Sequence, residues 1–419
     1  MREKLLVIGN GMASVRLCEE LLQHSPKAFD ITVIGAEKHV GYNRVLLSAN
    51  LAGDASESEL ELHDRAWYAA NNIHLVSNVK AVALDVIARQ VRLADGHVIA
   101  FDRLVLATGS VPLMPPLPGM DLPGVLAFRD LDDVATMREL CAREAQVVVM
   151  GGGLLGLEAA YGLARRGAKV TVLHLMDRLM ERQADGPAAR LLRAGLARRG
   201  IRIELLAQTA RVLGDVEVEG VELSDGRIIA AQALVCAIGI RPNVALAQAA
   251  GIKVERGILV DDYMQTSQPH IYALGECAQH RGVVYGLVEP AYQQARALAR
   301  HLGGDVEANY LGSLLSTHLK VSGIGLFSCG NFMGTAESQN SVMDDPQFGA
   351  YRKLVFEGNR LIGAILVGDT SDAAWYRDII ASAADVSAQR DMLIFGQDFV
   401  QAQPVQGGSG HAPAPRHAA

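Results

Sequence analysis

The chain has 419 residues, which is too long for one ordinary domain and predicts two or three. Half of the residues are apolar and a fifth are charged, as in α/β proteins with large cores. The formal net charge of −7 leaves no basic surplus to neutralise phosphates, so we do not expect a nucleic-acid partner. Residues 1–4 lead directly into an apolar strand, without the regions of a signal peptide. The apolar stretch 145–164 contains Glu158 and three consecutive glycines, so we expect a cytoplasmic protein without membrane contact.

The pattern strand, glycine turn, helix, strand occurs twice. The first copy has strands at 5–8 and 31–34, with the turn at 9–14 and a helix through Leu22. The second has strands at 147–150 and 169–173, with the turn at 151–156 and a helix to about Arg166. Strands that alternate with helices of this length predict parallel sheets with right-handed crossovers. We therefore expect two separate nucleotide-binding sheets.

Other segments suggest the domain order. A proline-rich linker at 112–123 follows the strand-glycine element 104–110, and a similar element spans 233–242. Strands 353–356 and 361–367, joined by Glu357-Gly-Asn359, predict an antiparallel hairpin. The expected fold is α/β, with two Rossmann-like dinucleotide-binding domains and a small α+β C-terminal domain. The predicted ranges are 1–113 with 243–308 for the first domain, 114–242 for the second, 309–400 for the third and 401–419 for a disordered tail.

The first glycine turn is Gly9-Asn-Gly11-Met-Ala-Ser14, and it opens a helix directly after a strand. The first glycine permits the tight turn, and the second lets the backbone approach a pyrophosphate at the helix N-terminus. Ser14 replaces the usual third glycine or alanine but is still small. Glu37, just past the second strand, is a candidate for ribose hydroxyls.

The second turn, Gly151-Gly-Gly153-Leu-Leu-Gly156, has all three glycines. Its second strand ends at His174, where an acidic residue would select NAD by binding the ribose 2′-hydroxyl. His174 with Arg178 would tolerate a 2′-phosphate, Asp177 is an alternative acid, and His174 can also be a solvated strand end. The choice between NADH and NADPH stays open, with a lean towards NADH.

The paired turns, Ala107-Thr-Gly109 and Tyr272-Ala-Leu-Gly275-Glu276 together resemble the FAD/NAD-linked pyridine-nucleotide reductases. The resemblance implies that the first unit binds FAD and the second binds the nicotinamide cofactor. It also implies that Glu276, where most members have aspartate, contacts the ribityl and phosphate region of FAD. The cofactor-binding residues expected on these grounds are Gly9, Gly11, Met12, Ala13, Ser14, Glu37, Arg44, Ser48, Ala107, Thr108, Gly109, Gly151, Gly153, Leu154, Leu155, Gly156, His174, Gly239, Gly275 and Glu276.

Within this family, three stretches look like the N-terminal flavin portion of the assimilatory NAD(P)H nitrite reductase large subunit. They are Tyr42-Asn-Arg-Val-Leu-Leu-Ser48, Gly275-Glu-Cys-Ala-Gln-His-Arg281, and His318-Leu-Lys-Val-Ser-Gly323 continuing to Gly368-Asp369. Arg44 matches a family arginine that approaches the FAD pyrophosphate, with a surface charge as the alternative. In that subunit, cysteine-rich iron–sulfur segments and a sirohaem domain follow the flavin portion.

The five cysteines, at 18, 141, 236, 277 and 329, form no local dithiol and no metal-ligand spacing, so we expect small core residues and no metal site. No cysteine follows Cys329, so we expect a stand-alone flavoprotein that does not reduce nitrite by itself. The loop 41–53 also lacks the cysteines of coenzyme A-disulfide and glutathione reductases. Related rubredoxin and ferredoxin reductases often carry lysine where this chain has Ala49, which removes a lysine partner for Glu158.

The expected reaction is hydride transfer from the nicotinamide to the flavin, with electrons then passed singly to a partner. Glu158 is the catalytic candidate because it matches a family glutamate near the nicotinamide; the alternative is a carboxylate favoured by the helix dipole. The expected partner is a nitrate or nitrite reductase catalytic protein or a small iron–sulfur carrier. A rubredoxin or ferredoxin reductase and a flavin-based redox-sensing binding protein stay as alternatives. The oligomeric state is open, with a homodimer among the options.

Overall fold

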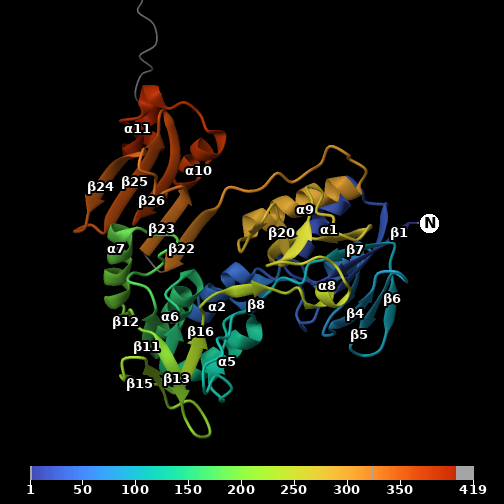
Figure 1. Cartoon of the computed structure of the whole chain (residues 1–419), viewed down its shortest axis with the longest axis horizontal. Coiled ribbons are helices and arrows are strands. Elements are labelled where there is room, and N and C mark those ends of the chain that lie inside the picture. Colours follow the sequence, from blue (N-terminus) through green and yellow to red (C-terminus); the bar gives the residue numbers. More distant parts are fainter. Residues whose placement is uncertain (1, 322–323, 403–419) are drawn as a thin grey trace, which may run out of the picture. The chain divides into compact units, whose positions relative to one another are not determined.

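The computed structural model describes residues 2–321 and 324–402 (Figure 1). The chain forms two compact units. The larger comprises residues 1–315 with 319–324, and the smaller comprises residues 316–318 with those from 325 onward. The larger unit carries both glycine turns.

The first parallel sheet of the larger unit has the strand order β19-β7-β1-β2-β3. Val7 pairs with Val33 on one side and Val105 on the other, and all three are fully buried. Strands buried on both faces are apolar throughout, which explains the unbroken run that ends β1. Helices α1 and α9 pack against each other beside this sheet. The bounds are β1 Glu3–Ile8, α1 Met12–His24, β2 Phe29–Ile34, β3 His74–Val76, β7 Arg103–Leu106, β19 Ile271–Ala273 and α9 Val288–Leu302.

The second parallel sheet has the order β12-β11-β10-β16-β9. Its central strand β10 pairs with β11 and β16, so that Val149 lies between Val172 and Val235. The bounds are β9 Val125–Leu126, α5 Leu131–Ala142, β10 Gln146–Met150, α6 Leu154–Arg165, β11 Lys169–His174, α7 Gly186–Ala197, β12 Arg202–Leu205 and β16 Ala233–Cys236. Both predicted strand–turn–helix–strand units are therefore confirmed, with ends within a few residues of the predicted ones.

Smaller sheets and short helices complete the larger unit. The sheets are β4-β5-β6, β13-β14-β15, β18-β20-β21 and the pair β17-β8. Pro112 ends β8, which lies at the edge of a two-stranded ribbon where proline is tolerated. The strand bounds are β4 Ala81–Asp85, β5 Gln90–Leu93, β6 Val98–Ala100, β8 Ser110–Pro112, β13 Thr209–Leu213, β14 Gly220–Leu223, β15 Ile228–Ala230, β17 Ile240–Pro242, β18 Ile258–Val260, β20 Ala278–His280 and β21 Val283–Val284. The helix bounds are α2 Leu47–Ala52, α3 Glu57–Leu60, α4 Arg65–Ala70 and α8 Ala245–Ala249.

Helix α2 packs against α6, the helix that begins at the second glycine turn. The contact is close because residue 162 is glycine. A Cβ atom at Gly162 would lie 2.9 Å from Cγ of Leu51, closer than real Cβ atoms approach a neighbour. Leu51 is fully buried. This packing brings Ser48 on α2 towards Glu158 on α6.

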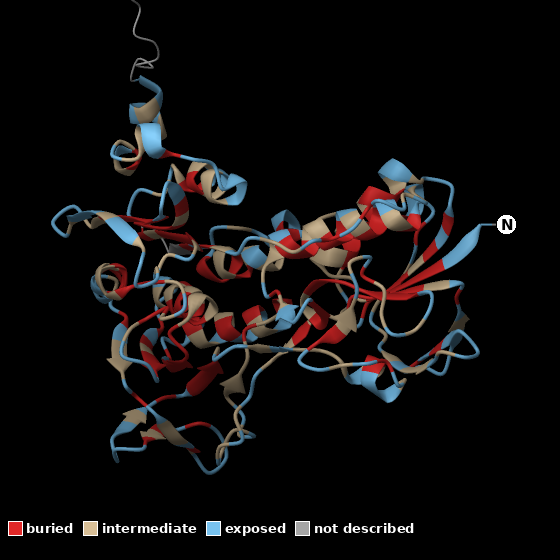
Figure 2. Ribbon diagram, turned by 45° about the horizontal axis from the view of Figure 1, so that its top comes forward, coloured by how far each residue is buried: buried red, intermediate tan, exposed pale blue. Residues whose placement is uncertain are grey.

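The smaller unit is an antiparallel sheet in the order β22-β23-β26-β25-β24, covered by α10. Its core contains Phe327, Leu354, Leu366 and Tyr376, which are almost completely buried (Figure 2). The predicted hairpin is confirmed as β25 and β26, and Gly358 occupies the turn with a positive φ of 56°. The bounds are β22 Ser316–Val321, β23 Ile324–Gly330, β24 Gln339–Asp345, β25 Ala350–Glu357, β26 Arg360–Val367, α10 Ala373–Ser382 and α11 Gln397–Ala402.

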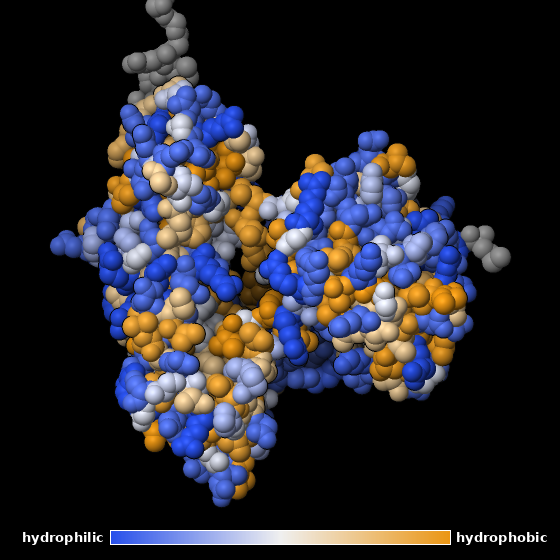
Figure 3. Space-filling model, in the orientation of Figure 1, coloured by the Kyte–Doolittle hydropathy of each residue, from blue (hydrophilic) through white to orange (hydrophobic). Residues whose placement is uncertain are grey.

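The chain therefore has the predicted α/β class with an α+β C-terminal part. Gln401 and Ala402, assigned to the tail, instead end α11 because the helix continues past residue 400, and residues 403–419 lie outside the described ones. Within residues 2–321 and 324–402, no helix is both long and apolar enough to cross a bilayer. On the face in Figure 3, hydrophilic residues alternate with apolar ones.

Candidate functional site

The first glycine turn forms an open cradle at the N-terminus of α1. A Cβ atom at Gly9 would lie 2.1 Å from the carbonyl oxygen of Ala107, so only glycine lets the turn lie against the end of β7. Gly11 is the N-cap, and apart from its own neighbours along the chain no described atom lies within 4 Å of the position its Cβ would take. Backbone N–H groups at a helix N-terminus with free space before them form an anion-binding site. The predicted residues Met12 and Ala13 begin the helix at this cradle.

Two buried polar atoms at this turn have no hydrogen-bond partner in the described part of the chain. They are Oγ of Ser14, which is 1% exposed, and Nδ2 of Asn10. Buried polar groups are nearly always paired, so these two atoms fit a site whose ligand supplies the missing acceptors. Gly275 approaches the same place, since its Cβ would lie 3.2 Å from Cβ of Ala13. The cradle therefore fits a dinucleotide such as FAD.

Charged side chains extend the cradle beyond the turn. Glu37 accepts a hydrogen bond of 2.7 Å from the Tyr42 hydroxyl and forms an ion pair with Arg44. Burial raises the pKa of Tyr42, so this hydroxyl keeps its proton and donates it. Arg44 also donates to the carbonyl oxygen of Arg129 at 2.9 Å. The predicted residues Glu37 and Arg44 are thus in direct contact, and Arg44 is no isolated surface charge.

Arg129 is a candidate that the sequence did not reveal. Its guanidinium pairs with Glu276, which also accepts a hydrogen bond of 2.8 Å from Ser110. Arg129 lies just before α5, remote in sequence from every motif. The only sequence feature that marks Arg129 is its place directly before Asp130, the residue that caps α5. That feature does not indicate a binding site. The guanidinium groups of Arg44 and Arg129 each pair with a carboxylate, that of Glu37 and that of Glu276.

The Ala107-Thr-Gly109 element connects β7 of the first sheet to β8 of the two-stranded ribbon. Thr108 donates a hydrogen bond of 2.6 Å to the carbonyl oxygen of Asn243, whose N–H donates to Gly109. Gly109 has a φ of 65°, which favours glycine. Cys277 lies below this element, is fully buried, and donates to the carbonyl oxygen of Leu106 at 3.3 Å. Burial raises the pKa of the Cys277 thiol, so it remains protonated.

The second glycine turn repeats the first. A Cβ atom at Gly151 would lie 2.3 Å from the carbonyl oxygen of Ala237, and one at Gly156 would lie 2.0 Å from that of Gly151. Gly153 is the N-cap of α6, ahead of Leu154 and Leu155, and its side-chain position is clear of described atoms to 4 Å. Gly239, with a φ of 131°, is similarly open. This turn also fits a dinucleotide pyrophosphate.

His174 ends β11 but is not the solvated strand end that we considered. It is 7% exposed, and its Nδ1 accepts a hydrogen bond of 3.1 Å from the N–H of Gly152. Its Nε2 lies 3.1 Å from Oε2 of Glu181. Arg178 is bonded to Asp177 and to the carbonyl oxygen of Ala184, whereas the hydrogen bonds of the His174 ring go to Gly152 and Glu181. Packing against the glycine turn draws the imidazole inward.

Glu158 and Ser48 lie together, a contact that the sequence did not predict. Burial raises the pKa of the Glu158 carboxyl to about 7, and a hydrogen bond from Ser48 opposes that rise. No charged group contributes to the shift, and the residue after Ser48 is the uncharged Ala49. Glu158 therefore exchanges a proton near neutral pH, two residues beyond Gly156 of the second turn.

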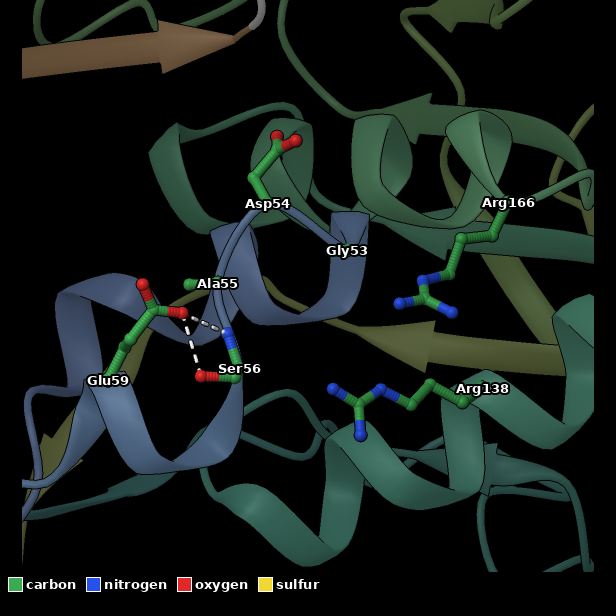
Figure 4. Close-up of a pocket in the computed structure, with 7 residues that line it drawn as sticks. All are labelled: Gly53, Asp54, Ala55, Ser56, Glu59, Arg138 and Arg166. Carbon is green, nitrogen blue, oxygen red and sulfur yellow. Dashed lines mark hydrogen bonds between the residues drawn. The ribbon is translucent and has the colours of Figure 1, made fainter.

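A separate surface cavity of about 490 Å³ lies between the loop after α2 and the helices α5 and α6 (Figure 4). The guanidinium groups of Arg138 and Arg166 lie side by side in it, while Asp54 points away and pairs with Arg165. None of its lining residues belongs to the predicted cofactor set. The cavity includes Asp54, part of an acidic run at residues 54–64 that is mostly solvated.

Two glycine cradles on two parallel sheets define a flavin- and nicotinamide-dependent oxidoreductase with tandem dinucleotide sites. The sequence matches the pyridine nucleotide-disulphide oxidoreductase family over residues 3–295. The chain belongs to this family and is an NAD(P)H-dependent flavoprotein oxidoreductase. Residues 316–384 match the rubredoxin NAD⁺ reductase C-terminal domain.

Two relatives from Bacillus subtilis match almost the whole chain. Nitrite reductase [NAD(P)H] is 47% identical over 92% of this chain and 48% of its own length. The assimilatory nitrate reductase electron transfer subunit is 39% identical over 94% of this chain and 51% of its own length. The chain thus spans about half the length of these relatives. The covalent putidaredoxin reductase–putidaredoxin complex is similar in structure, with a TM-score of 0.85, 27% identity, and coverage of 94% of this chain and 95% of that one. The predicted family and fold are confirmed.

Proposed function

We propose that this chain carries electrons from NADH through FAD to a cytoplasmic nitrate- or nitrite-reducing partner of the assimilatory type. The observation that carries the proposal is similarity over more than nine-tenths of the chain to a nitrite reductase and to a nitrate reductase electron transfer subunit. FAD, when bound, accepts a hydride from reduced nicotinamide and releases single electrons.

The residues divide between the two cofactors. The cradle of Gly9, Gly11 and Ser14 would hold the FAD pyrophosphate, with Arg44 and Arg129 supplying positive charge. Glu37 would accept from the ribose, and Glu276 would meet the ribityl and phosphate region. The predicted domain ranges 1–113 with 243–308 and 114–242 follow this division, with 309–400 as the third domain.

The turn that begins at Gly151 would hold the nicotinamide dinucleotide. Glu158 is the candidate catalytic residue, because its carboxyl can hold or release a proton near pH 7 beside Ser48. Apolar packing of α2 on α6 limits the access of water to this carboxyl. Alignment and exclusion of water are the main tasks left to the protein in such a transfer.

Purified protein tests the proposal. We expect about one FAD per chain, NADH-dependent reduction of an artificial dye, and no nitrite reduction by the chain alone. In the part of the chain that the structure describes, no three His, Cys, Asp or Glu side chains converge in a way that could hold a metal ion. Addition of a purified assimilatory nitrate or nitrite reductase catalytic protein should make nitrate or nitrite consumption depend on NADH. Nitrite reduction without a partner would contradict the proposal.

A rubredoxin or ferredoxin reductase is the second candidate. It is favoured by the match of residues 316–384 to the rubredoxin NAD⁺ reductase C-terminal domain and by the structural similarity to putidaredoxin reductase. The two candidate functions are distinguished by the rate of NADH-dependent turnover with purified rubredoxin or a [2Fe–2S] ferredoxin as the sole acceptor. Faster turnover with either carrier than with the assimilatory partner would favour the second candidate.

A further inference from the structure

The residues near the end of β11 bear on the choice between NADH and NADPH. In a dinucleotide-binding unit, the residue at this position lies by the ribose of the adenosine half, and an acid there accepts from the 2′-hydroxyl. This chain has His174 there, a residue with no negative charge of its own in either neutral tautomer. The histidine ring is bonded to a carboxylate, that of Glu181, seven residues further along the chain.

The hydrogen bonds assign the tautomer of His174. The N–H of Gly152 donates to Nδ1, so Nδ1 carries no proton. A neutral imidazole then has its proton on Nε2, which faces Oε2 of Glu181 at 3.1 Å and donates to it. The ring thus bridges the glycine turn and the carboxylate.

The residue before Glu181 is hydrogen-bonded to Gly152, which also contacts His174. The N–H of Met180 donates to the carbonyl oxygen of Gly152 at 2.9 Å. A Cβ atom at Gly152 would lie 2.7 Å from both Cγ of His174 and Cδ2 of Leu179, so both side chains pack directly on this residue. These contacts hold the carboxylate at a set position relative to the turn that receives the pyrophosphate.

The carboxylate retains an oxygen for a ligand. Only Oε2 of Glu181 is bonded to His174, while Oε1 lies 3.8 Å from Nε of Arg182, an ion pair whose arginine side chain is 85% exposed. Such an exposed contact contributes little. The Glu181 side chain is itself 25% exposed and accessible. The alternative acid of this segment, Asp177, is bonded to Arg178.

We propose that Glu181, oriented by His174, is the residue that selects NADH over NADPH in this chain. Its free oxygen accepts from the adenosine ribose hydroxyls, and its charge repels a 2′-phosphate. His174 is a positioning residue that carries no cofactor contact of its own. This inference rests on the proposed role of the second glycine turn as the nicotinamide-cofactor site.

Equilibrium binding tests it without turnover. NAD⁺ and NADP⁺ are titrated into the FAD-replete protein by calorimetry. We expect the wild type to bind NAD⁺ at least about tenfold more tightly, because like charges in contact are strongly unfavourable. Glu181→Gln should bring the two affinities within about threefold of each other by strengthening NADP⁺ binding and weakening NAD⁺ binding.

One further variant tests whether His174 orients Glu181, and a second serves as a control for the loss of a carboxylate charge. His174→Phe fills the space beside Gly152 without a nitrogen, so it should move the affinity ratio in the same direction by a smaller factor. Glu222→Gln is the matched control, since Glu222 is 26% exposed and paired with Arg211 in the separate sheet β13-β14-β15. It should leave both affinities unchanged.

The outcomes separate the role of Glu181 from the proposed function of the chain. An unchanged ratio in Glu181→Gln, or a shift produced by Asp177→Asn instead, would overturn the role of Glu181 and leave the reductase intact. Equal wild-type affinities for the two nucleotides would overturn it as well. Failure of the wild type to bind either nucleotide would instead contradict the proposed function.

Discussion

Replacement of Glu158 by glutamine should stabilise the protein above pH 7 and leave it unchanged near pH 4.5. Burial raises the pKa of this carboxyl from an ordinary 4.5 to about 7. Between these values the folded state binds more protons than the unfolded state, so folding stability falls as pH rises. Each pH unit across this interval corresponds to about 1.4 kcal/mol, and the loss totals at most ~3.5 kcal/mol above pH 7. Glutamine, with no charge to bury, avoids the loss.

The assay is thermal unfolding of FAD-replete wild type and Glu158→Gln, followed by circular dichroism from pH 5 to pH 8.5. We expect similar melting temperatures at pH 5 and a growing advantage of the variant, about 2–4 °C per kcal/mol, up to pH 8. Glu139→Gln, on the exposed side of α5, is the control and should show no such trend. A difference that stays constant over the whole pH range would refute the reasoning, because it would show that burial of charge is not the cause.

Three more predictions follow from the packing. Gly11→Val should remove most of the flavin absorbance per chain and keep the far-ultraviolet circular dichroism. The added Cβ has open space around it, so the side chain enters the space proposed for the ligand. Full FAD content would place the flavin elsewhere. Gly162→Val should lower the free energy of unfolding by about 1–3 kcal/mol, because its Cβ would overlap Leu51, and an unchanged melting temperature would argue against the α2–α6 contact. A chain with all five buried cysteines replaced by alanine should still reduce dyes with NADH; loss of this activity in a folded, FAD-replete variant would implicate Cys277.

Local sequence was sufficient for the two dinucleotide units and the hairpin. Glycine spacing between an apolar strand and a periodic helix is a short-range pattern, because the turn and the crossover form from neighbouring residues. The sequence also placed Glu37 and Arg44 within one loop, and the structure shows them in contact. The carbonyl oxygens that exclude a side chain at Gly9 and Gly151 belong to residues far along the chain. The two glycines could nevertheless be identified from the local sequence pattern.

Tertiary structure alone decided the partners of those residues. Arg129 reaches Glu276 across 147 positions of sequence, and Ser48 meets Glu158 only because α2 packs on α6. The sequence allowed His174 to be either a ribose contact or a solvated strand end. In the structure one ring nitrogen accepts from Gly152 and the other lies beside Glu181. Neither periodicity nor residue type encodes such contacts, since they depend on how separate elements pack. The sequence by itself determined where the two glycine turns begin their helices, and long-range packing decided which charges surround them.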